Sequence, residues 1–203
     1  MNNTCYIIGA GDYFDSPSPS KDDFVITADG GYSSAISHGV RCDLLIGDLD
    51  SLKNEPKGVE LMRHPVEKDE TDTHLSYLEG VRRGYTDFAI YGGTGGSLDH
   101  TLANISLLLQ ARKNGHTMRL YGKGCVMLCL MNESYSFSGR VGARVSVFAL
   151  GGEARGITLE GLKYSGQELT LTPEFALGVS NELALPRAIV SVADGAILLY
   201  IEK

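Results

Sequence analysis

Residues 87–115 read DFAIYGGTGGSLDHTLANISLLLQARKNG, and this stretch decides the fold. Its first five residues form an apolar run typical of a buried strand. Four glycines within the next five residues separate this run from apolar residues at helical spacing, namely Leu98, Leu102, Ile105 and Leu109. Arg112, Lys113 and Gly115 then form a basic, glycine-capped helix end. A strand, a glycine turn and a helix in this order predict an α/β sheet.

The glycine turn itself (Gly92, Gly93, Gly95 and Gly96) indicates contact with phosphate. Glycines let backbone N–H groups approach an anion at the positive end of a helix. They also make tight turns, but a turn does not require four of them. The turn matches neither a Walker A loop nor a dinucleotide fingerprint. Gly9-Ala-Gly11 begins such a fingerprint, yet Phe14 stands where the third glycine is required.

Carboxylates follow two upstream segments that read as strands, residues 24–28 and 43–46. Asp29 follows the first, and Asp48 and Asp50 follow the second. Alternate side chains of an extended chain share a face, so Asp48 and Asp50 can point at one object. A hard cation such as Mg²⁺ suits two adjacent carboxylates, although such a pair taken alone is more often part of a turn.

A third acidic segment, KDETDT at residues 68–73, precedes a helical pattern that stops near Gly84. The apolar side of that helix is predicted to contain Leu75, Leu78, Val81 and Tyr85. Asp69 and Asp72, three residues apart, can be neighbours at the helix start. They can bind a ligand, or they can simply be an acidic first turn that complements the helix dipole.

The second part of the chain has a different pattern. Short alternating segments, separated by Gly, Pro and Asn, occur at residues 144–148, 156–159, 168–172, 188–192 and 196–200. This pattern predicts an antiparallel β-sandwich, with a domain boundary near residues 122–132. We therefore expect an α/β nucleotide-binding domain with a mostly parallel sheet and Rossmann-like layers over residues 1–125, followed by an all-β sandwich over residues 126–203.

The composition restricts the function. The chain has 203 residues, of which 43% are hydrophobic and 21% charged, as in a soluble globular protein. A net charge of −7 argues against nucleic-acid binding as the main task. The four cysteines, without a CxxC pair, predict reduced core residues. Without a leader-like segment or a long apolar run, we expect a cytoplasmic protein with no membrane association.

Taken together, the acidic segments and the glycine turn recur at the carboxyl ends of successive predicted strands. These carboxylates are Asp29, Asp48 with Asp50, Asp69 with Asp72, and Asp99. In an open α/β sheet that edge binds ligands, so their recurrence predicts a metal-assisted phosphate site.

Five motifs carry a resemblance to a known family. ADGG at 28–31, GDLDS at 47–51, KDETDT at 68–73, GGTGGSLDH at 92–100 and GVSNE at 178–182 resemble thiamine pyrophosphokinase, in the family's order. The resemblance implies a catalytic α/β domain, a β-sandwich, and a homodimer whose active sites lie between subunits. It also implies transfer of the terminal diphosphate of ATP to the hydroxyethyl group of thiamine, which leaves AMP.

The resemblance also assigns roles to residues. Asp48, Asp50 and Asp72 are expected to hold Mg²⁺, with Asp29 and Asp69 close by, while Ser51 and Thr71 donate hydrogen bonds to phosphate oxygens. Lys68, His100 and the glycine turn are expected to cradle ATP, and Asp99 to bind the nucleotide or receive the substrate proton. Ser180, Asn181 and the ring of Tyr164 are expected to contact thiamine. From the residues alone, a turn asparagine at Asn181 and a strand tyrosine in the sandwich core at Tyr164 are the favoured interpretations.

One residue departs from the family pattern. Where the family commonly has Arg in its glycine motif, this chain has Ser97, which can form hydrogen bonds but cannot neutralise phosphate charge. This departure leaves one alternative to the kinase, a nucleotide- or thiamine-binding sensor with weak or lost catalysis. The acidic segments leave another, a Mg²⁺-dependent phosphohydrolase that uses the same carboxylates.

Overall fold

The computed structural model describes residues 3–13, 15–48, 56–65 and 69–203. The chain divides into two compact units. Unit 1 consists of Met1–Leu107 and Gly115–Lys123, and unit 2 of Leu108–Asn114 and Gly124–Lys203. Within the described ranges there are three helices, and the remaining regular structure is strand.

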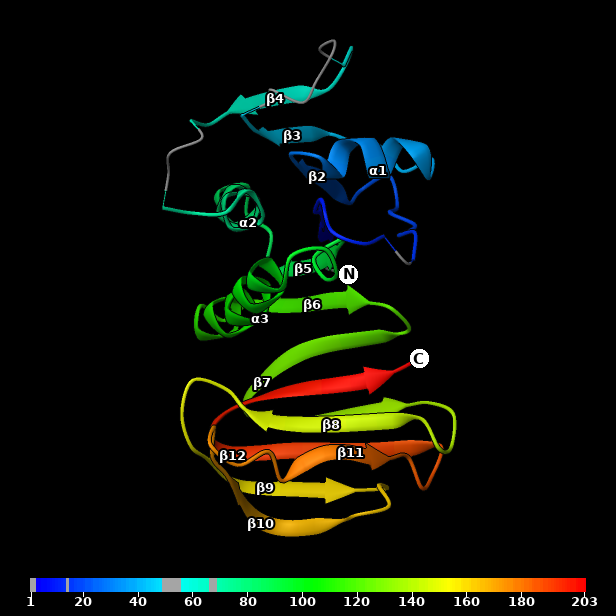
Figure 1. Ribbon diagram of the computed structural model, residues 1–203, viewed down its shortest axis with the longest axis vertical. Helices are drawn as coiled ribbons and strands as arrows, with labels where there is room; N and C mark the ends of the chain where they lie inside the picture. The colour runs from blue at the N-terminus through cyan, green and yellow to red at the C-terminus, as the bar shows by residue number, and fades with distance from the viewer. Residues whose placement is uncertain (1–2, 14, 49–55, 66–68) are drawn as a thin grey trace. The chain divides into compact units, whose positions relative to one another are not determined.

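Unit 1 is built on parallel strands (Figure 1). They are β1 (Thr4–Ile8), β2 (Phe24–Ala28), β3 (Leu44–Gly47), β4 (Glu60–Arg63), β5 (Asp87–Tyr91) and β6 (Thr117–Gly122). Their spatial order is β6-β5-β1-β2-β3-β4. β1 pairs with β2 on one side and with β5 on the other, so the order of the chain reverses between β1 and β5.

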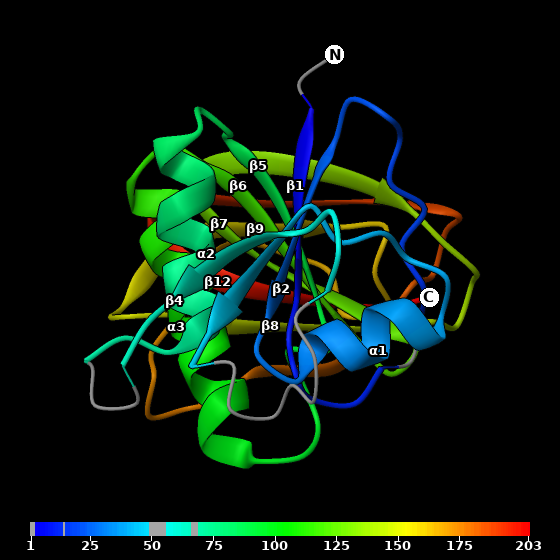
Figure 2. The same ribbon diagram turned by 90° about the horizontal axis from the view of Figure 1, so that it is seen from above.

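Helices cover both faces of this sheet. Figure 2 shows α1 (Gly31–Ser37) on one side, and α2 (Asp72–Arg82) and the start of α3 (Leu98–Lys113) on the other. The alternation along β1 explains this arrangement, since Ile8 packs with Ala35 of α1 while Cys5 faces Gly80 of α2.

The predicted apolar face of α2 is wrong. The helix buries Thr73, Ser76, Tyr77, Glu79 and Gly80, and leaves Leu78 40% exposed. Gly80 explains the difference, because a Cβ there would lie 2.6 Å from a ring atom of Phe88. The small residues bring the helix close to the sheet, and this close approach outweighs the leucine pattern.

The predicted face of α3 is also wrong. Leu98 and Leu102 are 72% and 56% exposed, and the buried residues are Asn104, Leu107, Leu108 and Ala111. Asn104 donates a 2.8 Å hydrogen bond from Nδ2 to the Gly93 carbonyl. A polar residue therefore fixes the orientation of the helix against the glycine turn.

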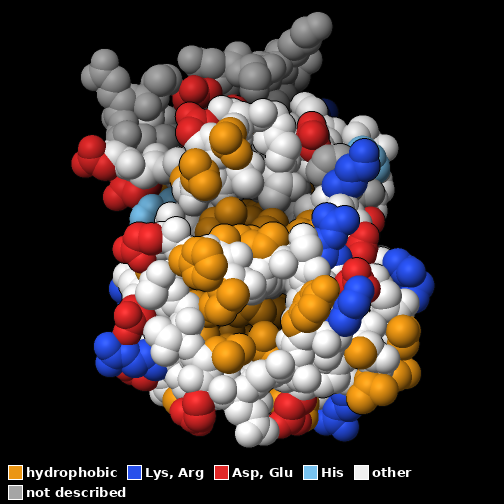
Figure 3. Space-filling model, turned by 60° about the horizontal axis from the view of Figure 1, so that its bottom comes forward, with side chains coloured by type: hydrophobic (Ala, Val, Ile, Leu, Met, Phe, Trp, Pro, Cys, Tyr) orange, Lys and Arg blue, Asp and Glu red, His pale blue; other side chains and the backbone are white. Residues whose placement is uncertain are grey.

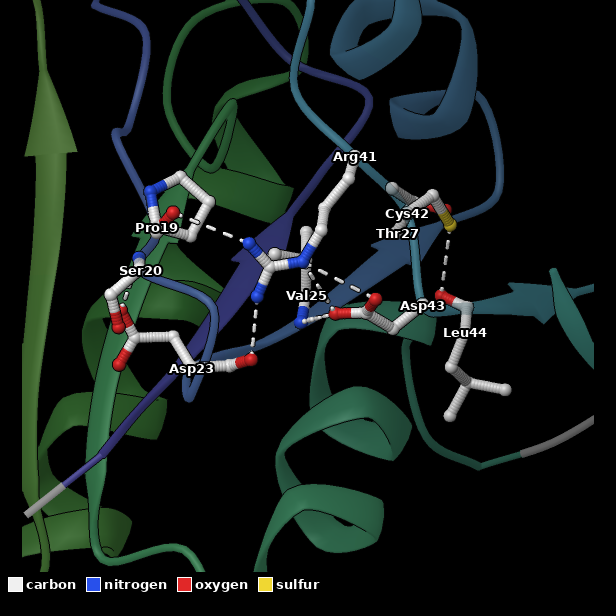
Figure 4. Close-up of polar contacts among 9 residues, drawn as sticks. All are labelled: Pro19, Ser20, Asp23, Val25, Thr27, Arg41, Cys42, Asp43 and Leu44. Atoms are coloured by element: carbon white, nitrogen blue, oxygen red, sulfur yellow. Dashed lines mark hydrogen bonds and ion pairs between the residues drawn. The ribbon is translucent and has the colours of Figure 1, made fainter. Parts of the chain in front are cut away.

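Arg41 fastens the loop between β1 and β2 at the amino ends of the strands (Figure 4). Its guanidinium donates to the carbonyl oxygens of Pro19 (3.2 Å) and Asp23 (2.6 Å), and to the Asp43 carboxylate (3.2 Å). Asp43 in turn accepts the Val25 N–H at 2.8 Å. These contacts anchor the Ser/Pro-rich loop at the end of the sheet opposite the predicted site.

The strands of unit 2 are antiparallel. They are β7 (Cys125–Ser138), β8 (Arg144–Ala149), β9 (Ala154–Glu160), β10 (Gly166–Leu171), β11 (Gly178–Glu182) and β12 (Arg187–Glu202). β12 pairs with β7 along its length, with β9 through its first half and with β8 through its second half. β10 pairs with β9, and β11 with β8.

β12 joins two segments that the sequence separates, residues 188–192 and 196–200. The register shifts between Val192 and Ala196, where Gly195 has a φ of +89°. The glycine therefore belongs to a bulge inside one strand and does not mark a turn between two strands. In the described part of the chain, no helix is long and apolar enough to cross a membrane.

Candidate functional site

Two glycine-rich loops lie side by side where β1 and β5 end. The Gly9 N–H donates to the Tyr91 carbonyl at 2.8 Å, and the Gly11 N–H donates to the Gly92 carbonyl at 2.7 Å. A Cβ at Gly9 would lie 2.6 Å from the Gly92 oxygen, and Gly92 has a φ of +61°. Only glycines allow this backbone-to-backbone approach.

A pocket of about 240 Å³ lies at these loops. Its lining consists of Ala10, Gly11, Thr73, Gly92, Gly93, Gly95, Gly96, Ser97, His100 and Asn104. The structure therefore brings the four glycines of the predicted turn and His100 to one pocket. It adds Ala10, Gly11, Thr73 and Asn104, which sequence reasoning missed. The incomplete fingerprint at residues 9–11 was the available signal for the first two.

The position of this pocket has a topological cause. It lies at the carboxyl ends of β1 and β5, where the strand order reverses. Loops diverge at such a switch point, and the crevice between them is where open α/β sheets bind ligands. The start of α3 follows the glycine loop directly, so its free N–H groups add positive potential there.

Asp99 lies in the exposed first turn of α3. Its carboxylate accepts hydrogen bonds from the Ser97 hydroxyl and from the His100 N–H, the latter at 2.8 Å. The Ser97 hydrogen bond is the main cause that lowers the pKa of Asp99, followed by the His100 N–H. A carboxylate stabilised in this way is a weak proton acceptor, so its geometry favours binding over general-base catalysis.

The ends of β2, β3 and β4 meet near Asp29 and Asp48. Asp29 has a φ of +46°, and its N–H donates to the Ile46 carbonyl at 2.8 Å. A Cβ on Gly47 would lie 3.2 Å from Cα and Cβ of Asp29. Asp29 therefore packs against the residue that precedes Asp48. This left-handed backbone is uncommon outside glycine and is tolerated best by Asp and Asn.

The start of α2 connects the third acidic segment to the glycine pocket. The Thr71 hydroxyl accepts the His74 N–H at 3.2 Å and caps the helix, and Asp72 lies in the first turn. The capping interpretation of this segment is thus correct in part, with Thr71 as the cap. Thr73, which follows Asp72 in the sequence, is 8% exposed and lines the glycine pocket.

Three predicted site residues, Asp50, Ser51 and Lys68, lie outside the described residues. Among the described residues, no three His, Cys, Asp or Glu side chains converge to hold a metal ion. The donor set at the strand ends nevertheless consists of carboxylate oxygens, which are the ligands of Mg²⁺. Mg²⁺ commonly takes only one or two protein carboxylates and completes its shell with water and substrate phosphates, so these residues fit that ion.

Unit 2 contains a second, more apolar pocket of about 340 Å³. Its lining consists of Ile157, Leu159, Tyr164, Ser165, Leu169, Leu171, Leu177, Gly178, Val179 and Asn181. Figure 3 shows apolar side chains gathered in and around a hollow in the lower half of the view. The Tyr164 side chain is 65% exposed, and Asn181 is 5% exposed. The structure thus brings Tyr164 and Asn181 to one pocket, whereas Ser180 is exposed and outside the lining.

The parallel sheet and the glycine-lined pocket at its switch point define an α/β protein of the class that binds ligands at the carboxyl edge of the sheet, with an appended antiparallel unit. Comparisons with known proteins identify the family. Residues 18–120 match the model of the thiamin pyrophosphokinase catalytic domain, and residues 132–197 match that of the thiamin pyrophosphokinase vitamin B1 binding domain. The chain belongs to the thiamin pyrophosphokinase family, and it is an enzyme of the diphosphotransferase class.

Individual relatives agree with this assignment. The chain is 28% identical over 181 residues to a thiamine pyrophosphokinase of Bacillus subtilis (strain 168), covering 86% of this chain and 85% of the relative. The crystal structure of thiamine pyrophosphokinase from Bacillus subtilis superposes with a TM-score of 0.90 at 23% identity, covering 99% of both chains. That of a thiamin pyrophosphokinase family protein from Enterococcus faecalis gives 0.86 at 25% identity, covering 100% and 99%.

Proposed function

We propose that the chain transfers the terminal diphosphate of ATP to the hydroxyethyl group of thiamine in a Mg²⁺-dependent reaction, giving thiamine diphosphate and AMP. The observation that carries this proposal is the glycine-lined pocket at the switch point of the sheet. A pocket lined by glycine backbone at a helix start suits a polyphosphate, and family membership makes ATP the substrate that brings it.

In this proposal ATP lies along the glycine loop. Backbone N–H groups of Gly92 to Gly96 contact its phosphates, Lys68 supplies positive charge, and His100 supplies a ring N–H hydrogen-bond donor. Thr71 and Ser51 donate hydroxyl hydrogen bonds. Asp99, held as an anion by Ser97, accepts hydrogen bonds from the nucleotide. Transfer of a phosphoryl-type group depends mostly on positioning and charge neutralisation, so the site does not require a strong general base.

Mg²⁺ would be held by Asp48, Asp50 and Asp72, with Asp29 and Asp69 near them. A bound Mg²⁺ ion would neutralise negative charge that builds up on the diphosphate during its transfer. The packing of Asp29 against Gly47 and the position of Thr73 in the glycine pocket support this grouping. Asp29 follows β2 and Gly47 ends β3, which supports a metal site at the carboxyl edge of the sheet.

Thiamine would bind at the apolar pocket of unit 2. The pocket offers apolar walls and the exposed Tyr164 ring, which suit a flat organic cation. Tyr164 contributes its ring. Asn181, which lines the pocket, and Ser180, which lies beside it, contribute polar contacts.

We propose that unit 1 acts as the catalytic α/β domain and unit 2 as a β-sandwich, in a homodimer whose active sites lie between subunits. The four buried cysteine thiols suit the reducing cytoplasm.

An assay of the products tests the proposal. The protein is incubated with thiamine, ATP and Mg²⁺, and the products are separated by chromatography. We expect AMP and thiamine diphosphate in equal amounts, with neither formed when thiamine is omitted. Formation of ADP, or the absence of a thiamine-dependent product, would overturn the proposal.

Ser97 supports one alternative, a sensor that binds its ligands without turnover. Its hydroxyl donates to Asp99, and a serine brings no positive charge to the pocket. Saturable binding of ATP and thiamine by calorimetry, with no AMP released, would favour the sensor. Phosphate release from ATP that is independent of thiamine would favour a phosphohydrolase instead.

A further inference from the structure

A short backbone bridge in unit 2 ends just before Tyr164. Leu162 and Leu183 form an isolated antiparallel bridge, and the Lys163 N–H donates to the Glu182 carbonyl at 2.9 Å. If the bridge continued by one more residue, the backbone of Tyr164 would pair with the backbone near residue 181. At that point the neighbouring strand β11 is irregular, because its register against β8 shifts between Gly178 and Asn181.

The side chain of Asn181 supplies the missing partners. Its Nδ2 donates to the Tyr164 carbonyl at 2.8 Å, and its Oδ1 accepts the Tyr164 N–H at 3.0 Å. Oδ1 also accepts the Glu182 N–H at 2.9 Å. Three of the four hydrogen-bonding positions of this buried amide are therefore used within the protein. Little capacity remains for a direct contact with a ligand.

The position of Tyr164 depends on its hydrogen bonds to the Asn181 side chain, here called the clamp, more than on packing. Its side chain is 65% exposed at the edge of the apolar pocket. A neighbouring cation, the Lys163 ammonium, lies 5.7 Å from the ring centroid, where it contributes weakly in solvent. The backbone from which the ring extends is therefore held by Asn181, which sets the direction of the Cα–Cβ bond.

We propose that Asn181 is a positioning residue, which acts on thiamine through Tyr164 by holding the tyrosine backbone so that the ring faces the pocket. The inference rests on the proposed function, and it changes the expected role of Asn181 from a direct thiamine contact to an indirect one. The clamp orders the aromatic surface before the substrate arrives, which lowers the entropic cost of binding.

The absence of tryptophan from the sequence gives a direct test. Tyr164→Trp introduces a single fluorophore at the pocket edge. The second substitution, Asn181→Asp in the Tyr164→Trp protein, keeps an oxygen that accepts the N–H groups of residues 164 and 182. It places a carboxylate oxygen against the carbonyl of residue 164, where the amide Nδ2 had donated. We expect lower fluorescence anisotropy, because the ring moves more freely. Asn132→Asp, at an exposed position outside the pocket lining, adds the same charge and should leave the anisotropy unchanged.

Kinetics separate the indirect role from a direct one. In the native background, Asn181→Asp should raise the KM for thiamine about tenfold, the worth of one aromatic contact, and leave the KM for ATP unchanged. In a Tyr164→Ala background the same substitution should add almost nothing. If the two substitutions together raise the KM for thiamine by the product of their separate effects, Asn181 contacts thiamine directly and the proposal is overturned. Asn181→Ser, which removes the contacts without adding charge, carries the same expectations if the Asp variant does not fold.

Failure of the proposed function gives a different result. If thiamine neither quenches the tryptophan fluorescence of the Tyr164→Trp protein nor supports AMP formation, thiamine binding is wrong. The anisotropy then still decides whether Asn181 orients residue 164. Unchanged anisotropy on Asn181→Asp overturns the clamp whether or not thiamine binds.

Discussion

At the scale of single residues, the carboxylates at the strand ends carry the strongest functional expectation. Asp48→Asn and Asp50→Asn each remove a charge that would hold Mg²⁺ and leave the side-chain volume nearly unchanged. We expect kcat/KM to fall by several kcal/mol in transition-state free energy, at least about 100-fold, while the fold is retained. The exposed Asp22→Asn removes an equal charge elsewhere and serves as the control. Full activity in both variants would show that these residues do not hold the metal.

Two glycines of the glycine turn share a left-handed backbone but differ in what a Cβ would meet. Gly92 and Gly96 have φ values of +61° and +57°, so alanine at either costs about 1–2 kcal/mol. A Cβ at Gly96 meets nothing within 4 Å, whereas one at Gly92 clashes with the Gly9 carbonyl. We expect Gly92→Ala to lower the free energy of unfolding by about 1–3 kcal/mol more than Gly96→Ala. Urea titrations measure both, and equal losses would contradict the proposed contact between loops.

At the scale of elements, Glu79 holds Arg83, and Arg83 connects the end of α2 to β4. Its carboxylate accepts hydrogen bonds from Arg82 (2.6 and 2.7 Å) and Arg83 (2.6 Å), and Arg83 also pairs with Glu60 of β4 at 2.6 Å. The hydrogen bonds from Arg82, ahead of those from Arg83, lower the pKa of Glu79. A lowered folded-state pKa stabilises the fold above the unfolded value of about 4.3, and this contribution disappears as pH falls through the folded value.

Glu79→Gln removes that pH dependence. The difference in unfolding free energy between the native protein and this variant should be largest near pH 6 and should shrink toward pH 3. Because every other carboxylate titrates in both proteins, the difference isolates Glu79. Urea titrations at the two pH values measure it. A difference that stays constant with pH would show that the ion pairs of Glu79 add nothing to stability.

The same elements show what the sequence could predict. Apolar runs located β2, β3 and β5, because burial on both faces of a parallel sheet leaves a strong pattern. The faces of α2 and α3 were wrong, because Gly80 and Asn104 set their orientation through contacts with Phe88 and Gly93 that lie far away in sequence. The glycine turn was predictable as part of a site from its four glycines, and its role as a phosphate loop stays a prediction. Its partner loop at Gly9–Gly11 was not predictable, since their pairing arises only in the folded sheet.

At the scale of the whole molecule, unit 2 exposes apolar side chains around its pocket. Tyr164, Phe175, Leu177 and Val179 are 65%, 66%, 55% and 44% exposed. Apolar groups gathered in this way commonly mark an interface, which supports the proposed homodimer. A dimer with its active sites between subunits would need the glycine pocket of one chain and the apolar pocket of the other.

Subunit complementation tests that arrangement. Asp48→Asn disables the glycine-pocket side, and Tyr164→Ala weakens the thiamine side when thiamine is kept below the native KM. If subunits mix freely at equal amounts, half of the dimers contain one chain of each kind, and each of these has one intact site. Co-expression should therefore restore about one quarter of the native activity, whereas Tyr164→Ala alone keeps about one tenth and Asp48→Asn alone about one hundredth or less. Sedimentation measures the dimer directly. A dimer without recovered activity would place each active site within one chain, because a mixed dimer would then contain no intact site.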